Sequence, residues 1–123
     1  MKKVITENAP AALGPYSQGI IANDILYTSG QIALDPHSSK IVGDTIEIQT
    51  EQVMKNLMAI FSEAGTSQEK TIKTTCFLAN MDDFAAFNAI YEKYFTEKPA
   101  RSCVAVKTLP KNVLCEVDAI VAL

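Results

Sequence analysis

The chain has 123 residues, of which 48% are hydrophobic, and its formal net charge at pH 7 is −3. This length fits one domain with one hydrophobic core, and the apolar content excludes an intrinsically disordered chain. The sequence also predicts no membrane helix, no secretory signal and no nucleic-acid surface, because it has no apolar run of about 18 residues, no apolar segment behind its first lysines and no basic block.

The first predicted element is a β-hairpin over residues 16–30. Two short apolar runs flank Asn23-Asp24, and a pair of turn residues between such runs is typical of a two-residue hairpin turn. The segment that follows, residues 34–43, is rich in turn residues and ends in a short strand at best. It contains the only histidine, His37, whose place in a turn argues against a catalytic triad or a metal site.

Residues 44–65 have the pattern of a long amphipathic helix. Apolar residues recur at roughly helical spacing, Asp44 and Glu47 resemble a capping box, and Gly65 suits the carboxyl-terminal cap. A threonine-rich strand over residues 71–79 and a second helix over residues 81–95, capped by an aspartate, come next. The second helix carries a stripe of aromatic residues that we interpret as core packing: Phe84, Phe87, Tyr91 and Tyr94.

Two strands, over residues 101–106 and 113–123, complete the chain. The order of elements predicts a single α+β domain over residues 1–123, with a mixed six-stranded β-sheet and two helices on one face. The last strand has apolar residues on both sides, for example Val117 and Ile120. An uncovered apolar sheet face usually packs against another subunit, so the pattern predicts a homo-oligomer.

Few residues have side chains that suit catalysis or ligand binding. Arg101 is the only arginine, and its planar fork suits a carboxylate clamp, although a surface ion pair is the alternative. Glu116 interrupts an apolar strand, either on a solvated face shared with Asp118 or in a cleft where it handles a proton. Tyr16 follows a stiff Gly-Pro turn and either walls a pocket or packs in the core. Cys103 is either a reactive thiolate beside Arg101 or an ordinary half-buried cysteine.

The three cysteines have neither the number nor the spacing of a disulfide framework or a metal knuckle, and we therefore expect no metal site. The simplest expected location is the cytoplasm.

Five segments together resemble one family. "GPYSQG", "TSGQI", "DFAAFNAIYEKYF", "PARSCVAV" and "LPKNVLCEVDAI" occur in the order found in the RidA family, also called the YjgF family of imine deaminases. The resemblance covers nearly the whole chain. It implies a chorismate-mutase-like fold, assembled as a homotrimer with active sites in clefts between subunits.

The resemblance also implies roles for single residues. Arg101 matches the residue that binds the substrate carboxylate, and Glu116 matches the acid that positions the hydrolytic water. The remaining positions match the lining of the cleft and the ligand-binding backbone: Tyr16, Ser29, Gly30, Gln31, Asn88 and Cys103. The implied reaction is the hydrolysis of 2-iminopropanoate and 2-iminobutanoate, which arise from 2-aminoacrylate and 2-aminocrotonate, to 2-ketoacids and ammonia. It needs no metal or cofactor.

Two other functions are compatible with parts of the sequence. The same clefts suit a regulatory, chaperone-like or small-carboxylate-binding module without turnover, and Glu116 is the residue that distinguishes this reading, because binding an acid gains nothing from a second carboxylate. A translation-inhibiting ribonuclease, an activity also attached to the family, fits less well with the net charge of −3 and a single histidine.

Overall fold

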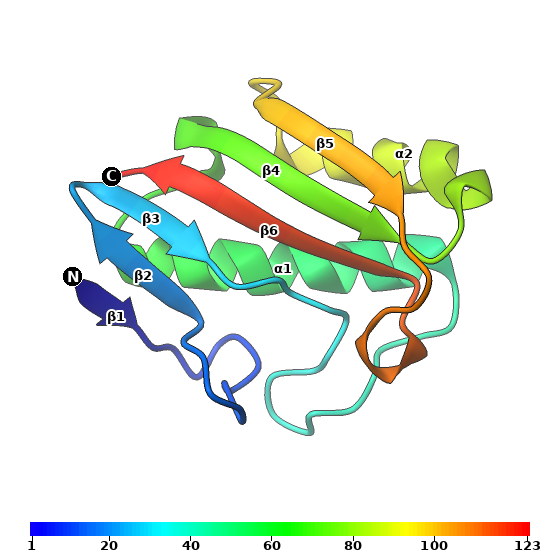
Figure 1. Cartoon of the computed structure of the whole chain (residues 1–123), viewed down its shortest axis with the longest axis horizontal. Helices are drawn as coiled ribbons and strands as arrows, with labels where there is room; N and C mark the ends of the chain where they lie inside the picture. The colour runs from blue at the N-terminus through cyan, green and yellow to red at the C-terminus, as the bar shows by residue number, and fades with distance from the viewer.

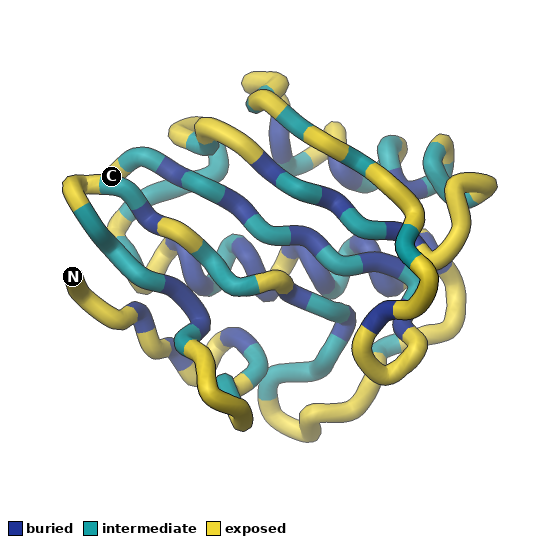
Figure 2. Tube along the Cα trace, in the orientation of Figure 1, coloured by how far each residue is buried: buried dark blue, intermediate teal, exposed yellow.

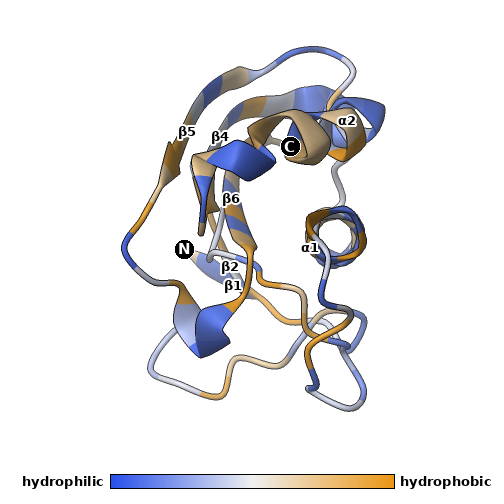
Figure 3. Ribbon diagram, turned by 90° about the vertical axis from the view of Figure 1, so that its right-hand side faces the viewer, coloured by the Kyte–Doolittle hydropathy of each residue, from blue (hydrophilic) through white to orange (hydrophobic).

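The structure, a computed structural model, describes residues 1–123. Six strands form one mixed sheet in the order β1-β2-β3-β6-β4-β5, and two α-helices pack on one of its faces (Figures 1 and 3). The strands are β1 (Lys2–Val4), β2 (Gly19–Ala22), β3 (Ile25–Thr28), β4 (Thr71–Leu78), β5 (Ala100–Ala105) and β6 (Cys115–Ala122), and the helices are α1 (Ile46–Ala64) and α2 (Phe84–Tyr94). Strands β4 and β5 are parallel, and all other neighbours are antiparallel. The predicted fold class is confirmed.

The hairpin β2–β3 has the predicted turn. Asn23 and Asp24 have φ angles of 52° and 61°, the left-handed pair that a type I′ turn requires. The sixth strand was predicted in the wrong place. Residues near Ile41 make only an isolated bridge to Leu34, whereas β1, at the amino terminus, pairs with β2. The segment around Ile41 cannot extend because Asp35 folds it into a turn, accepting hydrogen bonds from two backbone amides with its carboxylate.

The cap of α1 differs by one residue from the predicted cap, whereas α2 begins after an aspartate, as predicted. The side chain of Thr45, not Asp44, accepts a hydrogen bond from the backbone N–H of Ile48, so α1 begins one residue later than a cap at Asp44 implies. At its other end Gly65 is left-handed, with φ 82°, as predicted. Asp83 lies at the N-cap position of α2, as predicted, but its side chain makes no capping hydrogen bond. Asn80 instead caps the short 3₁₀ turn Met81–Asp83 that precedes the helix.

The core lies between the sheet and the two helices, as the alternating burial along β6 shows in Figure 2. The helix-facing residues of β6 are all buried, and the residues between them are half-buried on the opposite face. Neither α-helix covers that second face (Figure 3), where Tyr27 is 44% exposed. None of the helices combines the length and the apolar character needed to cross a membrane.

Candidate functional site

Arg101 and Glu116, the two residues predicted to carry the chemistry, lie on opposite faces of the sheet. Arg101 is the register partner of Thr74 in β4, a buried residue on the helix side. Glu116 is the partner of Phe77, which points the other way because successive strand residues alternate between faces. Within one chain the two side chains therefore cannot meet.

Arg101 is held by side chains of α2. Its Nη1–H donates a hydrogen bond of 2.7 Å to the Oδ1 of Asn88. The guanidinium carbon lies 4.8 Å from the ring centroid of Tyr91 and 5.5 Å from that of Phe84, within the range of cation–π contacts. A shallow cavity of about 300 Å³ opens beside the guanidinium and the Asn88 side chain. The partner of Arg101 is an amide, so the alternative of a surface ion pair finds no support.

Glu116 borders a second cavity, of about 430 Å³, on the other face. Its carboxyl group packs so closely on Gly30 that a Cβ at that position would lie 2.9 Å from the Glu116 Cδ. Burial raises the pKa of the Glu116 carboxyl above its ordinary value, and the negative charge of Asp118 raises it further. The carboxyl is thus partly desolvated in a cleft, which supports the second of the two readings of this residue.

A bulge places Gly30 against Glu116. Five residues, from Tyr27 to Gln31, lie opposite only four of β6, from Ile120 to Val117. The extra residue pushes Ser29 and Gly30 out of the sheet, and the Thr28 hydroxyl accepts the hydrogen bond of the Ala119 amide that the bulge leaves without a backbone partner. Gln31 then resumes backbone pairing with Val117. The bulge therefore creates the recess that the carboxyl group occupies.

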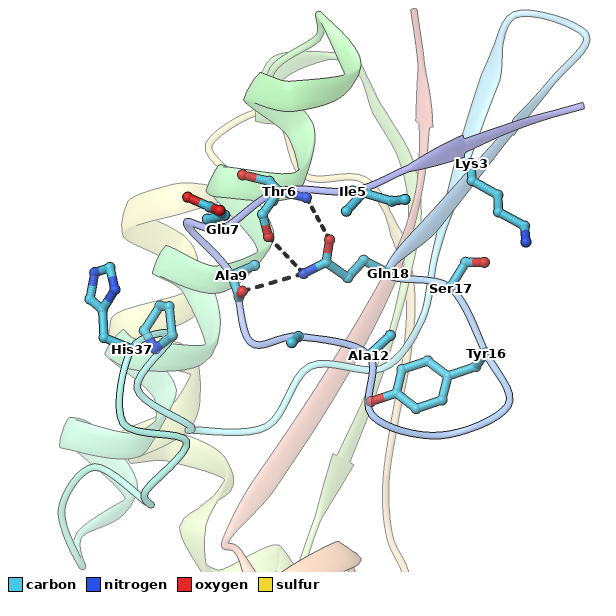
Figure 4. Close-up of a pocket in the computed structure, with 12 residues that line it drawn as sticks. Lys3, Ile5, Thr6, Glu7, Ala9, Ala12, Tyr16, Ser17, Gln18 and His37 are labelled. Carbon is cyan, nitrogen blue, oxygen red and sulfur yellow. Dashed lines mark hydrogen bonds between the residues drawn. The ribbon is translucent and has the colours of Figure 1, made fainter.

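Hydrogen bonds of two side chains, Gln18 and Ser29, hold the loop that carries Tyr16. Figure 4 shows the buried amide of Gln18, which accepts from the Thr6 N–H and donates to the carbonyls of Thr6 and Ala9. The Ser29 hydroxyl donates to the carbonyl of Ser17, which ties the loop to the bulge. Tyr16 itself is 54% exposed, so it does not pack in the core. It lines both the Glu116 cavity and the largest cavity of the chain, of about 590 Å³, which contains neither Arg101 nor Glu116.

Cys103 lies beside Arg101 on the helix side and is the register partner of Cys76. Burial raises the pKa of the Cys103 thiol, and the positive charge of Arg101 opposes this shift without cancelling it. The protonated thiol is favoured, which agrees with an ordinary half-buried cysteine rather than a reactive thiolate.

The structure thus divides the predicted site residues into two groups. Around the Glu116 cavity it brings together Tyr16, Ser29, Gly30, Gln31 and Glu116; beside α2 it brings together Asn88, Arg101 and Cys103. Sequence analysis missed Phe84 and Tyr91, whose rings contact the guanidinium. A signal was present: the polar Asn88 lies between these two residues at helical spacing, which is unusual for a stripe that only packs a core.

Comparison with known proteins assigns the family. Residues 6–123 match the family described as Endoribonuclease L-PSP. The chain belongs to this family. It is 59% identical to a Lactococcus lactis protein named as a candidate regulator, AldR, over 98% of this chain and 96% of the relative. It is 46% identical to the 2-iminobutanoate/2-iminopropanoate deaminase of Salmonella typhimurium, over 97% and 95% of the two chains.

Solved structures of relatives have the same fold. The YjgF gene product of E. coli is 43% identical and superposes with a TM-score of 0.94, with 99% of this chain and 98% of the other covered. TdcF of E. coli, solved with bound serine, is 38% identical with a TM-score of 0.94, over 100% and 99% of the chains. The resemblance to the YjgF and Rid proteins is therefore confirmed.

Proposed function

We propose that the protein hydrolyses small 2-imino acids, such as 2-iminopropanoate and 2-iminobutanoate, to 2-ketoacids and ammonia. The observation that carries the proposal is the pair of half-sites: a guanidinium with free N–H groups beside one cavity, and a partly desolvated carboxyl beside another. The name of the Salmonella typhimurium relative supports the reaction, and the serine bound to TdcF supports a ligand with a carboxylate.

Each half-site has a chemical role in this reaction. Arg101 donates two parallel hydrogen bonds to the substrate carboxylate and so fixes the imine carbon. Glu116 accepts a proton from a water molecule while the oxygen of that water forms a bond to the imine carbon. The raised pKa of Glu116 makes it a stronger base. The imine nitrogen is protonated when the water attacks, so the addition gives a neutral carbinolamine. Glu116 then passes its proton to the amine of the carbinolamine. As the carbon–nitrogen bond breaks and ammonia leaves, the hydroxyl group returns a proton to Glu116 and becomes the carbonyl of the 2-ketoacid.

Because the two half-sites face away from each other in one chain, the proposal requires a second subunit. We place the complete site between neighbouring subunits of a homotrimer, with Glu116 from one and Arg101 from the next. The uncovered sheet face supports this assembly, since it carries Tyr27 and the half-buried Ile120.

The direct test couples a serine or threonine dehydratase to the protein and follows the decay of the imine. We expect faster decay and a matching yield of ketoacid. If purified protein leaves the decay unchanged at micromolar concentration, the proposed function is wrong.

A complementation experiment tests the shared site. Arg101→Ala and Glu116→Gln should each be nearly inactive, and co-expression in equal amounts should restore activity. In a randomly mixed ring, about a quarter of the sites join an intact Glu116 to an intact Arg101. Recovery of about a quarter of the parental activity supports sites between subunits, and no recovery refutes them.

A second candidate, binding without turnover, is favoured by the name of the Lactococcus lactis relative. It predicts that carboxylate ligands bind while imine decay is unchanged. The family description also names an endoribonuclease. RNA cleavage is the weaker candidate because a net charge of −3 gives little attraction for a phosphate backbone. Incubation with single-stranded RNA tests it directly.

A further inference from the structure

We infer that Tyr91 is a positioning residue that holds the Arg101 guanidinium in place for the substrate carboxylate. The effect that we expect on imine hydrolysis rests on the proposed function. The effect on the position and mobility of the Arg101 guanidinium does not. Tyr91 belongs to the aromatic stripe of α2 that the sequence suggested was plain core packing.

The contacts of the guanidinium leave a binding edge free. The hydrogen bond that the structure gives to this group uses one N–H of Nη1, which donates to Asn88. A guanidinium carries five N–H groups, so the edge formed by Nε and Nη2 can still donate two parallel hydrogen bonds to a carboxylate. The side chain has four rotatable bonds, however, and a single hydrogen bond does not fix the direction of that edge.

Tyr91 supplies the second restraint. Its ring centroid lies 4.8 Å from the guanidinium carbon, closer than the 5.5 Å of Phe84. The π-face of a tyrosine attracts a cation, so the ring and the Asn88 amide hold the guanidinium at two different points. Tyr91 and Asn88 belong to α2, whereas Arg101 belongs to β5.

The ring is itself fixed. Tyr91 is only 7% exposed, and its ring packs against Phe87 and Phe95, with centroid distances of 5.7 and 4.8 Å. Its hydroxyl shares a hydrogen bond of 2.7 Å with the hydroxyl of Thr74.

Thr74 is the register partner of Arg101 on the neighbouring strand. The contacts therefore form a closed circuit: Arg101 to the Tyr91 ring, the Tyr91 hydroxyl to Thr74, and Thr74 back to Arg101 through the pairing of β4 and β5. A ring that only filled the core would not need a hydroxyl bound to the strand pair that carries the arginine. Burial raises the pKa of the Tyr91 hydroxyl, so the group stays neutral and keeps its hydrogen bond at neutral pH.

The experiment uses the fact that Arg101 is the only arginine. Its Nε–H gives one arginine side-chain signal in a ¹H–¹⁵N NMR spectrum, and the position and heteronuclear NOE of this signal report the surroundings and mobility of the guanidinium. The variants are Tyr91→Leu, which removes the ring, and Tyr91→Phe, which removes only the hydroxyl. Phe61→Leu is the control, because Phe61 is a buried aromatic residue of α1 for which the structure gives no contact with Arg101.

In Tyr91→Leu we expect the Arg101 signal to lose its ring-current shift and its NOE to fall. The kcat/KM for imine hydrolysis should fall roughly 3- to 30-fold, the factor that corresponds to a cation–π contact, with most of the loss in KM. Tyr91→Phe keeps the ring and should stay within about 3-fold of the parent in kcat/KM. It should melt at a lower temperature, because the buried Thr74 hydroxyl keeps only its weaker contact with the Cys76 thiol. Phe61→Leu should melt lower and keep the parental Arg101 signal and KM.

A parental Arg101 signal and KM in Tyr91→Leu would overturn the inference. Equal changes in Phe61→Leu would also overturn it, because they would show a general effect of core damage. Absence of imine hydrolysis by the parent would refute the proposed function instead, and the NMR signal, followed during a titration with 2-oxobutanoate, would still decide the role of Tyr91.

Discussion

The two half-sites are built in different ways. Arg101 stands on a strand and is packed against a helix, so regular backbone and ring contacts set its position. Glu116 also stands on a strand, but its surroundings are a bulge, the loop around Tyr16 and the turn at Pro110. If the proposed function holds, the position of the carboxylate-binding arginine depends on side-chain packing, whereas the position of the base depends on an irregular backbone.

The largest expected effect is that of removing the base. Glu116→Gln keeps the shape of the side chain and loses the proton acceptor, so we expect imine hydrolysis to slow roughly 10²- to 10⁴-fold. Carboxylate ligands should still bind, because Arg101 is unchanged. The measurement is single-turnover imine decay beside a ligand titration. Parental turnover would make Glu116 a bystander and favour the binding-only function.

On the binding side, Arg101→Lys keeps the charge and loses the fork. One hydrogen bond to a charged group contributes about 1.5–3 kcal/mol, so kcat/KM should fall roughly 10- to 150-fold. A melting curve and a sizing run serve as controls for fold and assembly. If the lysine variant hydrolyses imine at the parental rate, a point charge is sufficient and the clamp is not needed. If the oligomer is lost with the activity, Arg101 has a structural role in assembly.

The bulge can be tested without touching a charged residue. Gly30→Ala places a methyl group where the Glu116 carboxyl lies, and because the end of that side chain can move, the carboxyl should shift at little cost to stability. A displacement of a reacting group by about 1 Å can cost 10²-fold, so we expect kcat to fall roughly 10- to 100-fold.

Gly65→Ala is the matched control for this change. Gly65 is left-handed at the end of α1 and has open space around it, so alanine there should lower the stability by about 1–2 kcal/mol and leave kcat unchanged. Unchanged kcat in Gly30→Ala would show that the recess does not position the base.

The smallest expected effect concerns the pH profile. The charge of Asp118 raises the pKa of Glu116, so Asp118→Asn should lower this pKa. A general base acts when it is deprotonated. The acid limb of the pH profile of kcat should therefore move to lower pH in the variant. Asp24→Asn, an exposed aspartate in the hairpin turn, removes the same charge far along the sheet and should leave the limb in place. A limb that does not move in Asp118→Asn would contradict the coupling of the two carboxylates.

Much of the fold followed from local patterns in the sequence. The hairpin turn at Asn23-Asp24, the cap at Gly65 and the alternation of β6 depend on neighbouring residues, and all three were predicted correctly. The cap of α1 was misplaced by one residue, and the larger error arose where the partner is distant. Strand β1 is three residues long and exists because β2 offers it an edge, a pairing that no local pattern shows.

Parts of the site were also predictable, where they depend on local sequence patterns. Strand alternation placed Arg101 and Cys103 on one face, as observed. The roles of Tyr16 and Asn88 come from the family resemblance, and the structure locates Tyr16 at the Glu116 cavity and Asn88 in a hydrogen bond with Arg101. The close approach of Gly30 to Glu116 was not predictable, since it depends on one extra residue opposite β6.

The walls of the Glu116 cavity have a consequence for how such a protein can change over evolutionary time. Leu13, which lines that cavity, is 82% exposed and belongs to a loop outside the hydrophobic core. Substitutions in such loops have small effects on folding free energy, whereas substitutions around Arg101 disturb packed rings. The cavity on the Glu116 side can therefore change shape at little cost to folding, whereas changes around Arg101 cost stability. The chain thus separates the part that can diversify from the part that must be kept.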